Sequence, residues 1–270
     1  SIRSSYINGQ KMNSTFDQAA STYDATFTHS TIGKAQRNLV YEHLRRWLSI
    51  SNKYILEVNC GTGEDAIWLD KQGFEVIATD RSSKMIAVAE TKKTTSTVAF
   101  VQADINGISE QFSPKKFDVV LSNFGGLNCL NPKELKQFFN SCNELVPQNG
   151  KLLLVIMPKN TIWEKIYFIL KGKWKTAFRR NQDVTYANVD GAQVPTYYYN
   201  PKDVIAFSQE HFAFLESQPI GFFIPPSYLE PFFKNKQHLL HLLITLETRI
   251  KRWSFLSKYA DHYLLVLQKK

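Results

Sequence analysis

The residues best suited to chemistry lie in one short segment, Ile55–Gly63, which reads Ile-Leu-Glu-Val-Asn-Cys-Gly-Thr-Gly. Apolar residues typical of a buried strand run into a turn of small residues, and a helical pattern follows from Ala66. Gly61 and Gly63 would let a ligand lie against bare backbone, facing the partial positive charge of the N–H groups that open the next helix. The segment therefore predicts a strand–turn–helix ligand site.

Two common phosphate-binding motifs are absent from this segment. No lysine follows the glycines, as a P-loop requires. The dinucleotide spacing G-x-G-x-x-G is not met, because Asn59 replaces the first Gly and Ala66 stands where the third is expected. A nicotinamide oxidoreductase therefore stays only as an alternative.

Acidic residues follow the next two predicted strands. Phe74–Asp80 ends in a carboxylate that could accept two hydrogen bonds from a ribose diol, and Thr97–Gln102 is followed by Asp104. Near-continuous apolar strands of this kind are typical of a parallel sheet covered by helices on both faces. Two more strands are predicted over Phe117–Asn123 and Gly150–Met157, with helices over Ser82–Lys92 and Pro132–Leu145.

Together these segments resemble the class I S-adenosylmethionine-dependent methyltransferases of small molecules, whose nucleotide motif is E/D-x-G-x-G-x-G. Glu57, Gly61 and Gly63 stand in register with it, and Asn59 occupies the first glycine position. Asparagine enters positive φ more readily than other non-glycine residues, so we expect the turn to tolerate it. The resemblance covers about Tyr54 to Pro158. It implies an α/β fold with a doubly wound, seven-stranded, mostly parallel sheet, its last strand antiparallel, a helical N-terminal extension and an α+β lid insertion.

The resemblance also implies a cofactor, S-adenosylmethionine, and the residues that would bind it. Asp80 would bind the ribose, Asp104 the adenine amino group and Arg37 the methionine carboxylate, while Ile105 would pack on the adenine ring. The segment Phe-Asp-x-x-Ala-x-x-Tyr-Asp over residues 16–24 resembles the opening of small-molecule members. The full set implied is Tyr23, Arg37, Glu57, Asn59, Cys60, Gly61, Gly63, Asp80, Arg81, Asp104, Ile105, Asn123 and Phe124.

The second half of the chain is expected to bind the methyl acceptor. In the resembling family the segment after the fifth strand forms a lid over the acceptor, and here it is rich in aromatic and basic residues. An apolar or aromatic acceptor bearing a carboxylate, phosphate or phenolate would suit such a pocket. We name Asn128, Tyr197, Tyr198, Tyr199, Phe223 and Tyr228 as its candidate lining, and His29 and Asn123 as candidate catalytic residues.

Several elements are predicted for this half. Asp190-Gly191 indicates a hairpin turn. The predicted elements are a helix over Ile162–Arg180, a hairpin over Val184–Tyr199, a helix over Val204–His211, a strand over Phe212–Ile224, a helix over Tyr228–Trp253 and a last strand over His262–Leu267.

Composition bounds the organisation of the chain. Its 270 residues, 43% of them hydrophobic, can bury one elaborated domain. We divide it into N-terminal helices with the cofactor half (12–158), the lid (159–200) and the remainder of the sheet (201–270), and interpret 1–11 as a tag or leader. We expect no transmembrane segment and no signal peptide. Three scattered cysteines indicate neither a disulfide framework nor zinc, which favours a cytoplasmic protein.

The net charge of +9 raises the alternative of a nucleic-acid substrate. We consider that alternative weaker, because the basic residues are dispersed and Ser122-Asn123-Phe124-Gly125 stands where base-amino methyltransferases carry Asn-Pro-Pro-Tyr/Phe. His238 and His241 are three apart on a helical pattern but lack a third ligand, so no metal is expected. A protein acceptor, a homodimer and a non-catalytic module of methyltransferase fold stay open.

Overall fold

The computed structural model describes residues 24–49, 51, 53–189 and 192–270. Its main sheet has seven strands in the order β3-β2-β1-β4-β5-β9-β8. The five strands from the first half of the chain are all parallel, and β9 pairs antiparallel with both β5 and β8. The strands are β1 (Tyr54–Val58), β2 (Glu75–Asp80), β3 (Ala99–Gln102), β4 (Val119–Ser122), β5 (Lys151–Ile156), β8 (Phe212–Ile220) and β9 (His262–Lys269).

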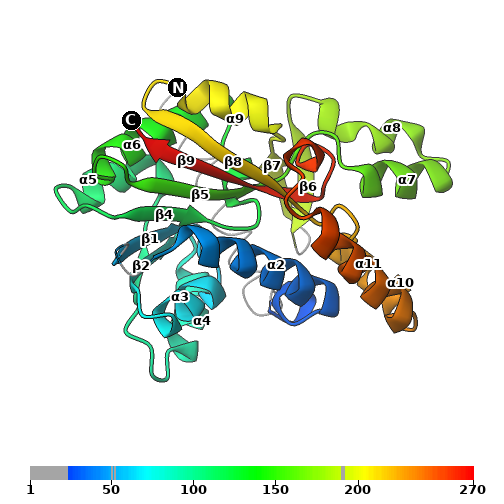
Figure 1. Cartoon of the computed structure of the whole chain (residues 1–270), viewed down its shortest axis with the longest axis horizontal. Coiled ribbons are helices and arrows are strands. Elements are labelled where there is room, and N and C mark those ends of the chain that lie inside the picture. Colours follow the sequence, from blue (N-terminus) through cyan, green and yellow to red (C-terminus); the bar gives the residue numbers. More distant parts are fainter. Residues whose placement is uncertain (1–23, 50, 52, 190–191) are drawn as a thin grey trace.

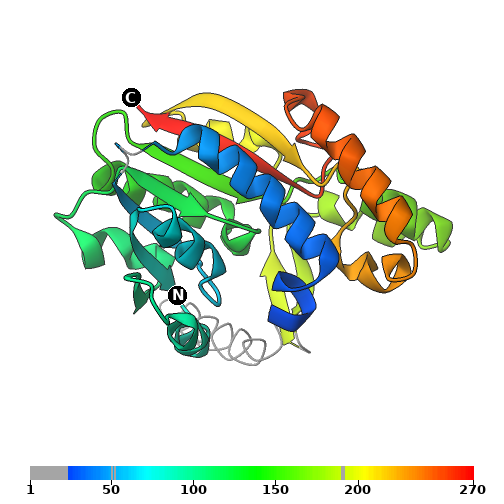
Figure 2. The ribbon, with the colours of Figure 1, turned by 60° about the horizontal axis from the view of Figure 1, so that its bottom comes forward.

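This topology confirms the predicted doubly wound α/β fold, including the antiparallel last strand. The strand order reverses between β1 and β4, which leaves a crevice at their carboxyl ends where ligands of open α/β sheets bind. The two views of Figures 1 and 2 show helices covering both faces of the sheet. This arrangement explains why the strands read as unbroken apolar runs.

One face of the sheet is covered by the helices that surround the first turn. Val40 and Leu44, four residues apart on α2, are fully buried against Ile55 and Leu264 of the sheet. Helix α11 closes the same face through Leu240. The elements of this layer are η1 (Asp24–Thr28), α2 (Thr31–Trp47), α3 (Glu64–Lys71), α4 (Ser83–Lys92), η5 (Ser227–Leu229), α10 (Glu230–Phe233), α11 (Gln237–Ile250) and η6 (Ser254–Leu256).

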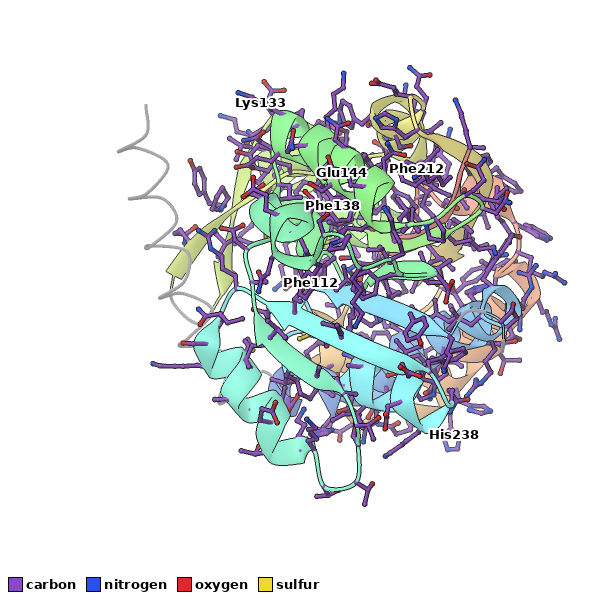
Figure 3. All side chains as sticks on the ribbon, turned by 90° about the vertical axis from the view of Figure 1, so that its left-hand side faces the viewer. Phe112, Lys133, Phe138, Glu144, Phe212 and His238 are labelled. Carbon is purple, nitrogen blue, oxygen red and sulfur yellow. The ribbon has the colours of Figure 1, made fainter. Side chains whose placement is uncertain are left out.

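The opposite face packs mainly under α6. Its apolar side chains, with Phe138 and Phe139 the largest, are buried together with Phe212 of β8, whereas Lys133 at the start of the helix lies at the surface (Figure 3). A capping box between Asn131 and Glu134 fixes the start of α6. The elements on this side are η2 (Ile105–Gly107), α5 (Ile108–Phe112), η3 (Gly126–Cys129), α6 (Pro132–Leu145) and α9 (Pro201–Ser208).

The segment between β5 and α9 does not contain the long helix predicted over Ile162–Arg180. The structure has α7 (Ile162–Leu170), α8 (Trp174–Ala177) and η4 (Arg179–Asn181) instead. Gly172 adopts φ +68°, and the N–H of Lys173 bonds back to the carbonyl of Phe168, so the helix ends in a left-handed cap. The predicted hairpin is present as β6 (Thr185–Val189) and β7 (Ala192–Thr196), and its turn lies outside the described residues.

Two further predictions for the second half were wrong in extent. The strand predicted over Phe212–Ile224 ends at Ile220, because Gly221 turns at φ +76° and the N–H groups of residues 221–224 all donate to the carboxylate of Glu247 at 2.6–3.1 Å. The helix predicted over Tyr228–Trp253 is broken into η5, α10 and α11, with Lys236 outside the helical region at φ −127° and ψ 44° before α11. Glu247 therefore connects α11 to the loop that follows β8.

Candidate functional site

The turn after β1 has the backbone conformation that its small residues predict. Asn59, Gly61 and Gly63 all adopt positive φ, at 57°, 52° and 78°. The predicted positive φ of Asn59 is thus confirmed. A Cβ built on Gly63 would lie 2.6 Å from the ring of Phe100, so only glycine fits between the turn and β3.

Asp80 fixes this turn from the end of β2. Its carboxylate accepts the N–H of Gly61 at 2.9 Å on one oxygen and the N–H of Ser82 at 2.9 Å on the other. Because β1 and β2 are parallel neighbours, the turn and Asp80 meet at one edge of the sheet. Asp104 follows β3 at the same edge, where its carboxylate lies 3.4 Å from Arg81 and caps η2. The two acids predicted to follow successive strands, Asp80 and Asp104, do lie at the ends of adjacent strands.

Glu57 lies beneath the turn and is almost fully buried. Burial, followed by the nearby Asp65 carboxylate, raises its pKa well above the usual glutamate range. One of its oxygens has no hydrogen-bond partner among the residues that the structure describes. A buried acceptor without a partner is costly, so this oxygen is suited to a donor group from a ligand.

Asp65 is the centre of the pocket, and sequence reasoning missed it. Its carboxylate accepts hydrogen bonds from Arg37, from the Tyr41 hydroxyl at 2.7 Å and from the Asn123 amide at 3.0 Å. All four side chains are buried. Arg37 and Tyr41 are four residues apart on one helix face, but this spacing does not point to Asp65, which lies 24 residues beyond Tyr41.

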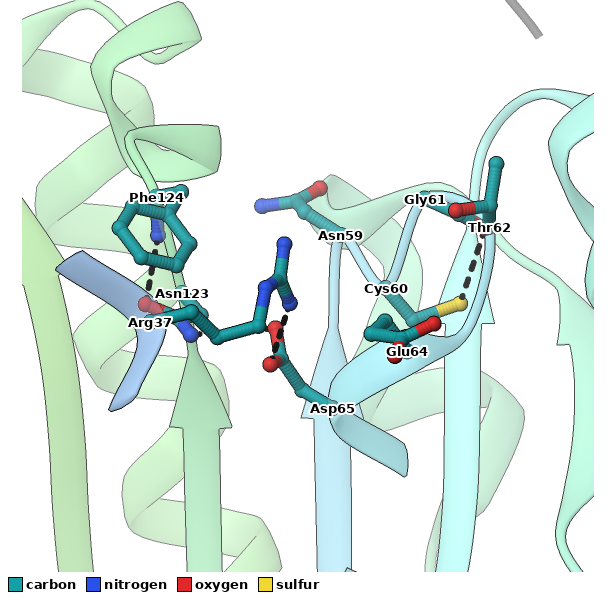
Figure 4. Close-up of a pocket in the computed structure, with 9 residues that line it drawn as sticks. All are labelled: Arg37, Asn59, Cys60, Gly61, Thr62, Glu64, Asp65, Asn123 and Phe124. Atoms are coloured by element: carbon teal, nitrogen blue, oxygen red, sulfur yellow. Dashed lines mark hydrogen bonds and ion pairs between the residues drawn. The ribbon is translucent and has the colours of Figure 1, made fainter. Parts of the chain in front are cut away.

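Figure 4 shows how these residues line one pocket at the carboxyl ends of β1 and β4. The Arg37 guanidinium points toward the Asp65 carboxylate, and its carbon lies 5.1 Å from the centre of the Phe124 ring. The Asn123 side-chain oxygen accepts the N–H of Phe124. The lining is Arg37, Asn59, Cys60, Gly61, Thr62, Glu64, Asp65, Asn123 and Phe124, of which Thr62, Glu64 and Asp65 were not predicted.

Three of the predicted acceptor residues make contacts with other parts of the protein. The Asn128 amide is buried and bonds the backbone of Met157 at 2.9 and 3.1 Å and of Tyr197 at 2.6 Å. The Tyr199 hydroxyl donates to the carbonyl of Leu130 at 2.6 Å, and the Tyr198 ring lies 4.5 Å from the Arg180 guanidinium. These contacts join the ends of β5 and β7 to the loop after β4.

The six residues predicted for the acceptor pocket are not brought together. Tyr197, Tyr198 and Tyr199 line a cavity of about 500 Å³ with Lys159 and residues of α9. Phe223 and Tyr228 are not part of its lining; Phe223 lies in the loop that binds Glu247, and Tyr228 packs edge-on against Tyr167 at 5.6 Å. The size of the cavity is within the usual range for small-molecule sites.

Of the two predicted catalytic residues, Asn123 lines the pocket and His29 does not. His29 is exposed, after η1, and its N–H donates to the carbonyl of Asp24. Another histidine, His262 at the start of β9, lies closer to the pocket, with its ring edge-on to Phe124 at 5.5 Å and its Nδ1 3.2 Å from Asp261. Tyr23 lies outside the described residues, and no metal-binding cluster occurs within the described part of the chain.

Comparison with known proteins agrees with this geometry. Residues 55–150, which include the turn, match the family model described as a methyltransferase domain. A protein of Geobacillus sp. (strain WCH70) that is named as a methyltransferase is 34% identical over 142 residues, covering 52% of this chain and 56% of the relative.

Residues 55–150 of this chain therefore form a methyltransferase domain.

Solved structures share the fold of this methyltransferase domain and its additions at low sequence identity. The PH0226 protein from Pyrococcus horikoshii OT3 has a TM-score of 0.60 at 18% identity, covering 92% of this chain and 98% of that one. The structure of DhpI in complex with SAH has a TM-score of 0.57 at 19% identity, covering 77% of this chain and 89% of DhpI. The chain spans about half the length of the curated relatives it matches.

Proposed function

We propose that this chain transfers a methyl group from S-adenosylmethionine to a small-molecule acceptor. The observation that carries the proposal is the turn of residues 59–63 at the carboxyl ends of β1 and β2. Beneath it lies a Glu57 oxygen that has no hydrogen-bond partner in the described part of the chain. The methyltransferase family model covers the same residues.

The charges around the turn suit this cofactor. Asp65 and Asp80 contribute two carboxylates beside the turn, and Arg37 lines the pocket together with Asp65, to which it is bound. S-adenosylmethionine carries a sulfonium and an ammonium group against one carboxylate, so an acidic site complements it. A dinucleotide, with its anionic pyrophosphate, would be repelled by the same acids.

Several of the predicted cofactor residues have a defined role in this proposal. Asp80 would accept hydrogen bonds from the ribose, and Asp104 and Ile105 would flank the adenine. Arg37 is already held by Asp65, so it would meet the methionine carboxylate in a fixed orientation. The bare backbone of the turn would allow close approach of the ligand.

Methyl transfer depends more on how the acceptor and the cofactor are positioned than on acid–base groups of the protein. The bound cofactor supplies a methyl group on a sulfonium, which is a good leaving group. The protein has to align the acceptor with that methyl and keep water out. Phe124, which packs edge-on with Phe27 at 5.1 Å beside Arg37, is suited to excluding water on that side of the pocket.

A small acceptor is supported by the cavity lined by Tyr197, Tyr198 and Tyr199. Its aromatic walls would suit an apolar molecule. Lys159, Lys202, Asp183 and Asp203 also line it, with Lys159 lying 3.5 Å from Asp203, and could bind polar groups of the acceptor. An acceptor on nucleic acid or protein is the alternative. Mass spectrometry of small-molecule and macromolecular fractions, after incubation with methyl-labelled cofactor, would separate the two; label found only in macromolecules would contradict a small acceptor.

Titration calorimetry tests cofactor binding directly. We expect S-adenosylmethionine and S-adenosylhomocysteine both to bind at micromolar concentration, and a nicotinamide dinucleotide not to bind. No heat with either adenosyl compound would refute the proposal. Binding of both without labelling of any acceptor would favour a non-catalytic module of the same fold.

A further inference from the structure

The tip between α7 and α8 carries exposed apolar residues among lysines. Leu170 is 81% exposed and Trp174 is 61% exposed, and the sequence between Leu170 and Lys175 is Leu-Lys-Gly-Lys-Trp-Lys. Lys171, Lys173 and Lys175 are all exposed as well. Such an arrangement is costly in water unless the apolar side chains meet another apolar phase.

A second tip of the same character precedes α11. Phe232 is 56% exposed, and the exposed Lys234 and Lys236 follow it. On α11 itself Leu239 and Leu242, three residues apart on one helix face, are also exposed. The second tip therefore repeats the combination of bulky apolar and cationic side chains.

Ring contacts join the helices that carry the two tips. Trp163 of α7 packs edge-on against Phe233 of α10 at 6.3 Å, and Tyr167 packs against Tyr228 at 5.6 Å. Figures 1 and 2 both show α7, α8, α10 and α11 at the end of the molecule opposite the C-terminus. We call the exposed residues of 165–179 and 231–246 the basic apolar face.

The formal charges of the basic apolar face are all positive. Neither residues 165–179 nor residues 231–246 contain an aspartate or glutamate, although together they contain seven lysines and arginines. The nearest carboxylate in α7, Glu164, is buried and bound by Arg179 and Arg180. The partner of this face must therefore be anionic as well as apolar.

We propose that the basic apolar face docks on the surface of an anionic lipid bilayer. Lysines attract acidic headgroups, while Trp174, Phe232 and Leu170 can enter the boundary between headgroups and acyl chains. Nucleic acid fits less well, because the aliphatic Leu170, Leu239 and Leu242 cannot stack on bases as aromatic rings do. A second copy of the chain fits less well too, since two faces of equal positive charge would repel. No helix in the described residues has the length and apolarity to span a bilayer, so the contact would be peripheral.

Vesicle flotation of the full chain, without any cofactor, tests the proposal. We expect binding to vesicles of phosphatidylcholine mixed with phosphatidylglycerol, little binding to phosphatidylcholine alone, and weaker binding at high salt. Leu170→Gln and the double variant Lys173→Gln/Lys175→Gln should each reduce binding by about tenfold. Since these residues are exposed, the variants should fold normally, which circular dichroism would verify.

Matched controls are available elsewhere on the surface. Leu215→Gln, at an exposed position of β8, and Lys133→Gln/Lys136→Gln, on exposed positions of α6, should bind vesicles like the unmodified chain. Failure to bind the acidic vesicles, or equal losses in test and control variants, would overturn the proposal. Preferential binding of RNA or DNA, or self-association abolished by Leu170→Gln, would assign the face to those partners instead. None of these readouts depends on methyl transfer, so the face and the proposed activity can fail separately.

Discussion

At position 59 an asparagine takes the left-handed conformation that a glycine usually holds. Its φ of 57° is the conformation of αL, and its side chain lies against Gly126, where an added Cβ would be 2.5 Å from the Asn59 Cβ. The turn therefore depends on backbone freedom at this residue and on a small neighbour across the pocket.

We predict that Asn59→Gly keeps or improves affinity for S-adenosylmethionine, because glycine enters positive φ without a clash. Asn59→Val should lose affinity, since a β-branched residue at this φ costs about 1–3 kcal/mol. Titration calorimetry on both variants measures the difference. Equal affinities would mean that ligand binding does not need the observed turn.

Asp80 holds the turn through two backbone N–H groups and is the predicted ribose ligand. We expect Asp80→Ala to weaken cofactor binding by about 1.5–3 kcal/mol, the range for hydrogen bonds that involve a charged group. Glu110→Ala, which removes an exposed carboxylate on α5, serves as the control. The assignment of Asp80 would not survive an unchanged dissociation constant.

At the scale of elements, α2 contributes side chains both to the pocket and to the buried interior of the domain. Its inner face carries Arg37 and Tyr41 toward the pocket and His43 into the interior, all of them buried. Burial lowers the pKa of His43 from 6.5 to about 4. The packing of this helix therefore favours a neutral imidazole.

The lowered pKa of His43 makes the stability of the protein decrease at low pH. Between pH 6.5 and 4 the unfolded chain binds a proton at His43 that the folded chain does not. The free energy of unfolding therefore keeps its full value above pH 6.5. It decreases by up to about 3 kcal/mol as the pH is lowered to 4. Urea unfolding across this range should show a smaller loss for His43→Leu than for the unmodified chain. His238→Leu, at an exposed position, should leave the slope unchanged; identical slopes for all three proteins would contradict the role of His43.

At the scale of the whole molecule, a buried ionic network joins the segment after β5 to the last strand. Glu164 of α7 binds Arg179 at 2.5 Å and Arg180 at 2.8 Å, and Arg180 also lies 3.6 Å from Asp261, which receives the Gln36 amide from α2. Opposite charges also hold the pKa of Asp261 below its usual range against the effect of burial. Helix α2, the α7–α8 segment and β9 therefore share one network.

We predict that Glu164→Gln destabilises the protein by about 3 kcal/mol, because Arg180 would lose its closest carboxylate while staying buried. Lys159→Gln, which removes an exposed ion pair with Asp203, should cost less than about 1 kcal/mol. Urea unfolding followed by circular dichroism and tryptophan fluorescence should give one coincident transition. Separate transitions would show that the 159–200 segment unfolds independently.

The local sequence was sufficient to determine the strands, the turn and most helices of the first half. Apolar strands and small-residue turns are recognised from a few consecutive residues. The short apolar runs of the buried parallel strands, separated by such turns, did not also fit a helical pattern. In the second half, short-range patterns predicted long helices over Ile162–Arg180 and Tyr228–Trp253. A left-handed Gly172 and a non-helical Lys236 divide them, and neither break has a strong signal in a helical window.

The candidate site was determined partly by the sequence and partly only by the tertiary structure. Asn59, Gly61 and Asp80 could be recognised because they follow strands whose ends must meet at one sheet edge. Asp65 could not, because its three donors come from α2 and from the end of β4, up to 58 residues away. Likewise, only the folded chain shows that the Asn128 and Tyr199 side chains bond backbone groups far away in the sequence, since such distant partners leave no periodic pattern to read.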